Sequence, residues 1–329
     1  MKKRRNIVAA GLALAFAAAA VPGAAVAQQQ AAFPNAPLKV IVPFAAGGLS
    51  DVVARVLGEK VGAELGQPVV VENRVGAGGA IGTKAVIAAK PDGLTLLSMS
   101  AANAILPLLQ ENVYDWEREL VPVIGIGSVP YAIAVNAKSN IRSLNDLVAA
   151  AKATQGGINY ASGGQGSPSH LAPARLVSEL RVNATHVPYS GLAGAVQALL
   201  GNQVQFICAT TADVTKLVKS GDLRLLAVTS EQRLPELADT PTMAELGFAD
   251  FYPSTWYAFL VPARTPAAVV ERLHGAFAKS ASDPGVQERL RGLGLTITLR
   301  SGPELGRFMR EDVARWRRVI QDNNIKLAN

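Results

Sequence analysis

The sequence predicts an α/β protein with largely parallel sheets. Short runs rich in β-branched and other apolar residues alternate with helical stretches along the chain, which is the pattern of strands joined by helical crossovers. Several of these runs are continuously apolar, as strands buried on both faces are. About 300 residues follow an N-terminal leader, which is enough for two hydrophobic cores.

The expected strands cover residues 38–44, 68–72, 94–98, 121–126, 131–135, 158–161, 184–187, 204–208 and 223–229. A helix is expected over 51–65, where Val53, Leu57 and Val61 recur four residues apart, and a second over 192–200. Pro303 opens a final helix, which we expect to pack on a preceding domain.

Residues 1–27 have the pattern of a secretory signal peptide. Four cations, Lys2 to Arg5, precede an apolar run over 7–21, and Ala25-Val26-Ala27 follows it. This order predicts export and cleavage after Ala27. The alternative, a retained membrane anchor, is disfavoured because the apolar run is shorter than the ~20 residues that span a bilayer.

Charge and cysteine content narrow the function classes. The four leader cations account for most of the net charge of +7, so the mature chain carries about +3. No dense basic run remains, which argues against a nucleic-acid partner. The arginines at 310, 315, 317 and 318, with Glu311 and Asp312 among them, are interpreted as the solvated face of the last helix. Cys208 is the only cysteine, which excludes an intrachain disulfide.

Two glycine-rich turns lie where ligands of α/β sheets bind, between the end of a strand and the start of a helix. In the first, Gly47 and Gly48 follow the strand that ends at Phe44, and Ser50 or Asp51 is expected to cap the next helix. In the second, the segment 162–170 (SGGQGSPSH) precedes a helix that Pro168 favours. Both turns could hold an anion, although each alone is also an ordinary structural turn.

A third glycine cluster, Gly76 to Gly82, does not have the spacing of a dinucleotide-binding turn. The third glycine is one residue late, and no acidic residue ends a second strand at the required distance. No Gly-Lys-Ser/Thr follows any glycine run, so a P-loop is excluded too. A close helix–strand crossing, or one wall of a cleft, explains these glycines better.

Few side chains suit catalysis, and we expect no enzyme activity, no cofactor and no metal. The histidines are His170, His186 and His274, and none is spaced with Cys, Asp or Glu as metal ligands are. No G-x-S-x-G motif is present. His170, beside the second turn, either donates a hydrogen bond to a ligand carboxylate or ties the turn to its own helix. Cys208 is interpreted as a core residue.

Ordered motifs cover nearly the whole mature chain. They are VPFAAGG at 42–48 with Asp51 and Arg55, LGQPVVVENR at 65–74 with GAGG at 76–79, PDG at 91–93, NYAS at 159–162, GS at 166–167 with HL at 170–171, HVPY at 186–189 with Gly191, 225–230 with Arg233, and Trp256 with Ala263 and Thr265-Pro266. In this combination the chain resembles the Bug family, the extracytoplasmic receptors of tripartite tricarboxylate transporters.

The resemblance implies a two-lobed periplasmic binding protein fold of type II, the Venus flytrap, with a mainly parallel sheet flanked by helices in each lobe. Lobe 1 would comprise 28–127 and 230–329, and lobe 2 would comprise 128–229, with chain crossings near 126–129 and 228–230. The implied ligand-binding residues are Phe44, Ala45, Ala46, Gly47, Gly48, Ser50, Asp51, Ser162, Gly164, Gly166, Ser167, His170, Tyr189 and Gly191.

The implied function is capture of a small carboxylate (a di- or tricarboxylate, an acidic amino acid or an aromatic acid) in the periplasm and delivery to a membrane permease. We expect a monomer. The alternative is a receptor that reports its ligand to a membrane sensor kinase without transport. The chain departs from the family pattern at Ser190, at Gly194 and over 172–175 (APAR), which changes the expected charge of the second lobe's rim.

Overall fold

The computed structural model describes residues 33–189, 191–249, 251–323 and 325, and the leader predicted over 1–27 lies outside them. The strands are β1 (Leu38–Val42), β2 (Val69–Asn73), β3 (Thr95–Ser100), β4 (Leu120–Asn136), β5 (Ile158–Ser162), β6 (Ala184–Pro188), β7 (Phe206–Thr210), β8 (Leu223–Val228), β9 (Ser254–Pro262) and β10 (Thr296–Ser301). The α-helices are α1 (Leu49–Leu65), α2 (Ala80–Ile87), α3 (Ala101–Leu109), α4 (Trp116–Glu119), α5 (Leu144–Ala153), α6 (Pro168–Leu180), α7 (Leu192–Leu200), α8 (Thr211–Lys219), α9 (Ala267–Ala281), α10 (Pro284–Gly292) and α11 (Gly302–Asp322).

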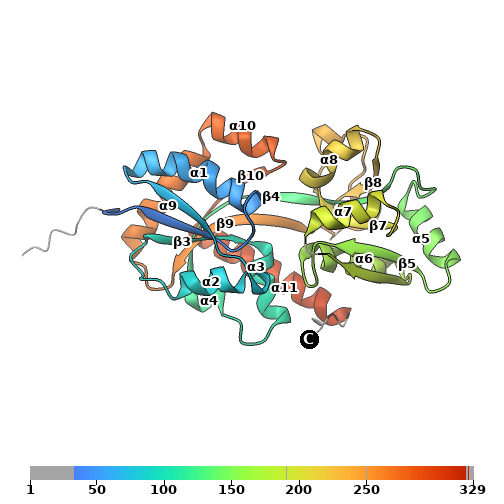
Figure 1. Ribbon diagram of the computed structural model, residues 1–329, viewed down its shortest axis with the longest axis horizontal. Coiled ribbons are helices and arrows are strands. Elements are labelled where there is room, and N and C mark those ends of the chain that lie inside the picture. Colours follow the sequence, from blue (N-terminus) through green and yellow to red (C-terminus); the bar gives the residue numbers. More distant parts are fainter. Residues whose placement is uncertain (1–32, 190, 250, 324, 326–329) are drawn as a thin grey trace, which may run out of the picture. The chain divides into compact units, whose positions relative to one another are not determined.

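The strands pair in the order β2-β1-β3-β9-β4-β7-β5-β6, and β8 and β10 also pair with β4. We call β1, β2, β3, β9, β10 and the first half of β4 the first section, and β5 to β8 with the second half of β4 the second section (Figure 1). Strands β1, β2 and β3 are parallel, and so are β5, β6 and β7. The pairs that involve β4 or β9 are antiparallel, so the largely parallel prediction holds only for the outer strands.

Strand β4 belongs to both sections, and the prediction of two separate strands over 121–126 and 131–135 was wrong. It pairs with β9 as far as Pro130 and with β7 and β8 from Tyr131 onward. Gly127 and Pro130 resemble strand breakers, but a local register shift precedes Gly127 and the ladder continues from there through Pro130. A Cβ on Gly127 would lie 2.3 Å from the Thr296 carbonyl oxygen, so this glycine permits the close approach of β10.

Helices cover both faces of the second section. Phe206 and Cys208 pack in the same cluster as Leu171 of α6. Because side chains alternate along a strand, the intervening Ile207 points the other way and packs with Leu199 of α7. In the first section, Figure 1 shows α1 and α9 on one side of the strands and α2 on the other.

The predicted apolar stripe of α1 is confirmed, since Val53, Leu57 and Val61 are fully buried. Burial of each such side chain stabilises the folded state by roughly 1.5–3 kcal/mol. The last helix, α11, is confirmed with Pro303 in its first turn. It packs on β4, α3 and α6, as expected of a helix that returns to earlier parts of the chain.

Asp312 was expected on the solvated face of α11, and this was wrong. The arginines at 310, 315, 317 and 318 are exposed, but Asp312 is buried and accepts a 2.9 Å hydrogen bond from the indole Nε1 of Trp256. Arg315 donates to its other oxygen. A charge pattern alone could not reveal this buried acceptor.

The third glycine cluster forms the predicted close crossing. A Cβ on Gly82 in α2 would lie 2.8 Å from the Arg74 carbonyl oxygen and 2.9 Å from Cα of Pro43. Only glycine lets the helix approach the backbone that follows β1 and β2 so closely. Gly76, Gly78 and Gly79 have positive φ angles and form the turn into this helix.

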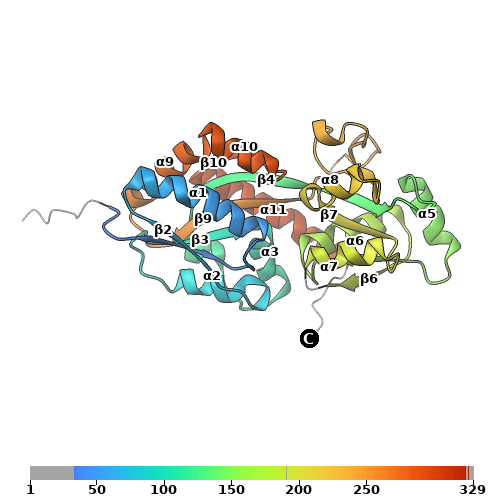
Figure 2. The same cartoon turned by 45° about the horizontal axis from the view of Figure 1, so that its top comes forward.

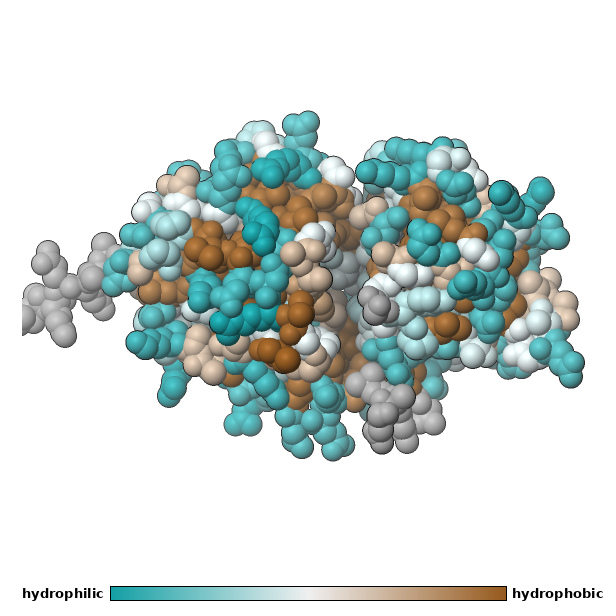
Figure 3. All heavy atoms as spheres, in the orientation of Figure 1, coloured by the Kyte–Doolittle hydropathy of each residue, from teal (hydrophilic) through white to brown (hydrophobic). Residues whose placement is uncertain are grey.

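Within the described ranges, no helix is long and apolar enough to cross a membrane. On the face drawn in Figure 3, hydrophobic residues form small groups separated by hydrophilic ones. Large apolar side chains that are exposed include Val75, just before the third glycine cluster, and Ile81, within it.

Candidate functional site

Both predicted turns lie at the carboxyl ends of parallel strands. The first loop, residues 43–48, connects β1 to α1, and the second loop, residues 163–167, connects β5 to α6. The neighbouring strand β6 leads through 189–191 into α7. Each section therefore presents at least one helix start at the edge where α/β proteins bind ligands.

The start of α1 has no side-chain cap. Its N-cap is Gly48, and no side chain accepts a hydrogen bond there, so neither Ser50 nor Asp51 is the cap that the sequence suggested. The first N–H groups of a helix have no partner inside the helix. Residues 45–48 are exposed, and Gly47 has φ +82° with open space around its Cβ position. This loop can receive an anion at the N–H groups of Leu49 and Ser50.

Asp51 fixes the shape of the first loop. Its buried carboxylate accepts hydrogen bonds from the Gly47 N–H (2.9 Å), from Asn73 Nδ2 (2.9 Å) and from Arg55 Nε (3.0 Å). Asn73 Nδ2 also donates to the carbonyl oxygen of Phe44. Burial of the carboxyl opposes its ionisation, but the hydrogen bonds from Arg55, Gly47 and Asn73 outweigh burial and lower the pKa of Asp51. Asp51 is thus an acceptor inside the loop.

The glycine N–H groups of the second loop also bond within the loop. Gly164 donates to Ser162 Oγ (3.1 Å) and Gly166 donates to Nδ1 of His170 (3.0 Å). Ser167 Oγ donates to the Gly164 carbonyl (2.7 Å), and Gly163 donates to Ser169 Oγ (3.0 Å). The backbone groups expected to face a ligand hold the loop together instead.

His170 plays the structural role that the sequence left open. It is 6% exposed, its Nδ1 binds the loop, and its ring lies parallel to that of His186, with centroids 3.7 Å apart. Tyr160 stacks on both imidazoles. Burial, with a smaller effect of His186, lowers the pKa of His170 to about 3, and burial lowers the pKa of His186 to about 4. Both rings are neutral near pH 7.

The start of α7 also has no side-chain cap, a feature that it shares with α1, α2, α6, α8 and α9. Its N-cap, Gly191, has φ 128°, no side-chain cap and open space at its Cβ position. A Cβ on Gly163 would lie 2.9 Å from the Leu192 nitrogen, so the second loop touches the first turn of α7. Helices α6 and α7 cover opposite faces of the strands of the second section, which Figures 1 and 2 show from two directions. Tyr189 donates its N–H to the Ser162 carbonyl and its hydroxyl to Gln203.

Sequence reasoning named Asn73 within a motif, His186 within a motif and among the histidines, and Ser169 within the second turn, but gave none of them a role in the site. Asn73 ends β2 beside β1, and an amide at the carboxyl end of a neighbouring strand is a signal that could have identified it. His186 could be found only from the pairing of β5 with β6, which places it opposite Tyr160.

In the part of the chain that the structure describes, no group of three or more His, Cys, Asp or Glu side chains could hold a metal ion. Cys208 is fully buried in β7, as interpreted from the sequence, and burial raises the pKa of its thiol.

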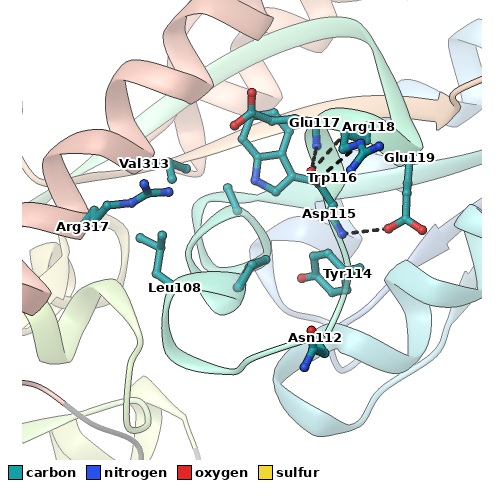
Figure 4. A pocket seen from close by; sticks show the side chains of 12 residues that line it. Leu108, Asn112, Tyr114, Asp115, Trp116, Glu117, Arg118, Glu119, Val313 and Arg317 are labelled. Atoms are coloured by element: carbon teal, nitrogen blue, oxygen red, sulfur yellow. Dashed lines mark hydrogen bonds and ion pairs between the residues drawn. The ribbon is translucent and has the colours of Figure 1, made fainter.

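A pocket of about 860 Å³ lies apart from both loops, where α3, the segment 112–119 and α11 meet (Figure 4). Leu108, Tyr114 and Trp116 contribute its apolar and aromatic surface, and Arg317 reaches it from α11. None of the predicted site residues lines this pocket, and no sequence motif indicated it.

Comparisons with known proteins identify the relatives of this chain. The family model described as "Tripartite tricarboxylate transporter family receptor" matches residues 53–325. Protein BugT of Bordetella pertussis is 35% identical over 99% of this chain and 100% of its own length. The solved structure of the periplasmic binding protein BugD is 35% identical and covers 89% of this chain and 99% of its own, with a TM-score of 0.79.

Two further structures are from Rhodopseudomonas palustris. MatC with bound malate is 29% identical over 88% of this chain and 100% of its own, with a TM-score of 0.78. A protein solved with adipate is 27% identical over 89% of this chain and 99% of its own, with a TM-score of 0.81. These likenesses confirm the resemblance drawn from the motifs and the predicted binding-protein fold.

Proposed function

Because the chain belongs to the family of tripartite tricarboxylate transporter receptors, we propose that it is a periplasmic solute-binding protein. It captures a small carboxylate and delivers it to the permease of such a transporter. Its ligand class follows the relatives solved with malate and adipate, which are both dicarboxylates.

The observation that carries the proposal is the pair of helix starts at Gly48 and Gly191, where the N-cap is a glycine, no side chain caps the first turn, and the helix follows a parallel strand. One belongs to each section, and both lie next to glycine-rich loops whose own hydrogen bonds are already made. Free N–H groups and the positive end of the helix dipole attract carboxylates without a buried counter-charge. The first loop has Arg55 nearby, but Asp51 engages its guanidinium.

The two sections correspond in this proposal to the two lobes, 28–127 with 230–329 and 128–229. At their boundary, where the proposed hinge lies, Thr229 joins the chain crossings: its Oγ1 accepts a hydrogen bond from the Tyr131 N–H (2.8 Å) and lies 2.6 Å from the Pro253 carbonyl oxygen. A ligand that touches both lobes favours the closed form. Saturating ligand should therefore reduce the radius of gyration of the mature chain in small-angle scattering, and an unchanged radius would contradict lobe closure.

Thermal-shift and calorimetric titration of the mature protein with malate, adipate, citrate, glutamate and benzoate test the ligand class. A ligand bound only by the native state stabilises it by about 2.7 kcal/mol at 100 times its Kd, so the correct class raises the Tm. The dimethyl ester of the best dicarboxylate should not bind. Equal binding of acid and ester, or no shift with any carboxylate, would refute the proposal.

Gly47→Ala and Gly66→Ala form a matched pair for the site. Both glycines have positive φ (82° and 67°) and open space at Cβ, so the backbone strain is the same kind, on the order of 1 kcal/mol. They lie at opposite ends of α1. Gly47→Ala should weaken ligand binding, whereas Gly66→Ala should leave affinity unchanged; equal effects would place the ligand elsewhere.

A further inference from the structure

His186 lies behind the second loop. In the pairing of β5 with β6, it stands directly opposite Tyr160, and their ring centroids are 5.1 Å apart. Ser162 is two residues beyond Tyr160 and on the same face of the sheet. The imidazole Nε2 of His186 reaches this last residue of β5, 2.7 Å from Ser162 Oγ, at the point where the loop begins.

The hydrogen bonds around Ser162 define the protonation of His186. Ser162 Oγ accepts from the Gly164 N–H (3.1 Å) and lies 3.0 Å from the Gly164 carbonyl oxygen. A hydroxyl has one proton and two acceptor positions. All three contacts are made together when Ser162 donates to the Gly164 carbonyl and His186 donates from Nε2 to Ser162.

The same histidine supports the other side of the loop through His170. The two rings are nearly parallel, with an angle of 11°, and Nδ1 of His170 accepts from the Gly166 N–H. His170 must therefore carry its proton on Nε2. Gly164 and Gly166 are thus both held from one stacked pair, the first through Ser162 and the second through His170.

We propose that His186 is a positioning residue that pre-forms the second loop by donating from Nε2 to Ser162 and by stacking on His170. Its effect on affinity rests on the proposed function; its effect on the loop does not. Pre-forming the loop removes the entropy cost of ordering it when ligand arrives. The loop in turn seats the first turn of α7 through the contact of Gly163 with Leu192.

Substitutions separate the two contacts of His186. His186→Phe keeps an aromatic ring for stacking but removes the hydrogen bond. Ser162→Ala removes the same bond from its other end, together with the two contacts of Ser162 Oγ with Gly164. The control is His274→Phe, which changes a histidine on α9 in the first section. Amide hydrogen exchange of Gly164 and Gly166, measured by NMR without ligand, reports the loop directly.

His186→Phe should speed exchange of the Gly164 N–H about tenfold, since one hydrogen bond contributes ~0.5–1.5 kcal/mol. Ser162→Ala should speed it at least as much, because it also removes the acceptor of this N–H. The double variant should add little, and His274→Phe should change nothing. Unchanged Gly164 exchange in folded His186→Phe would overturn the proposal. If that variant does not fold, ¹⁵N-imidazole spectra of the unmodified protein decide, because a His186 protonated on Nδ1 would overturn it.

Affinity for the best carboxylate, measured by calorimetry, is the functional readout. His186→Phe should weaken binding about 2- to 12-fold, the equivalent of that hydrogen bond. If His186→Phe loosens the loop but binds the carboxylate as tightly as the unmodified protein does, the link between loop order and affinity would be overturned. Failure of the unmodified protein to bind any carboxylate would instead refute the proposed function, while the exchange data would still decide the role of His186.

Discussion

Acidification should destabilise the folded chain through His170. The ordinary pKa of histidine is 6.5, and burial beside His186 lowers the pKa of His170 to about 3 in the fold. Between about pH 6.5 and pH 3 the unfolded chain therefore binds a proton at this position that the native chain does not. Stability is fully present above pH 6.5 and is lost as the pH falls through this window.

The magnitude follows from the linkage relation. The slope reaches about 1.4 kcal/mol per pH unit for one proton, so lowering the pH from 7 to 5 should cost about 2 kcal/mol through His170 alone. The half-buried His186 adds an effect of the same sign, because its pKa is also lowered.

Urea unfolding of the mature protein at pH 7, 6 and 5, followed by far-UV circular dichroism, measures the effect. His170→Gln cannot titrate, so its stability should fall about 2 kcal/mol less over this range than that of the unmodified protein. Contributions from carboxylates elsewhere cancel in the comparison, and His274→Gln provides the control. An identical pH dependence for His170→Gln and the unmodified protein would refute the buried neutral stack.

Substitutions at Asp51, Asp312 and Gly127 and a reactivity test of Cys208 each examine a single feature. Asp51→Ala should lower the free energy of unfolding by about 2–3 kcal/mol, since it leaves several donors without their charged acceptor; a loss under 0.5 kcal/mol (about the range of surface changes) would contradict the network. Asp312→Ala should lower the free energy of unfolding by about 1–3 kcal/mol, because it leaves the Trp256 indole N–H without an acceptor. Asp312→Asn keeps an acceptor and should lower it less, so calorimetry should give Asp312→Ala the lower Tm of the two variants. The Cys208 thiol should react with Ellman's reagent only after unfolding, and reaction of the native protein would disprove its burial. Gly127→Ala should disrupt the β4–β10 pairing, because its Cβ would meet a carbonyl at 2.3 Å; wild-type protection of the β10 amides would contradict this.

Local patterns predicted most strands and the helices that were named. The run 192–200 matches α7 residue for residue, because a short helix between glycine and a turn has clear end signals. Strands β9 and β10 were not proposed. β10 is largely exposed and so lacks a continuous apolar run, whereas β9 is buried and was overlooked.

The two loops were predicted at their observed places in the fold, but the hydrogen bonds within them were not predicted. Glycine-rich turns after strands identified both loops, since they depend on neighbouring residues alone. The acceptors of Gly47 and Gly166 were not identified, because Asp51 and His170 could be read as capping or ligand residues as well as loop anchors. The interaction of His186 with Ser162 depends on strand pairing between residues 24 apart, which no local pattern specifies.

The long strand β4 also determines when the fold can be completed during synthesis. Its first half pairs with β9 and β10, which leave the ribosome after every strand of the second section has been made. Until then, β3 and the first half of β4 expose unpaired edges, a state prone to wrong pairing between chains. The nascent chain therefore needs protection from aggregation until residues 254–301 have emerged from the ribosome. A chain truncated before residue 254 should be insoluble.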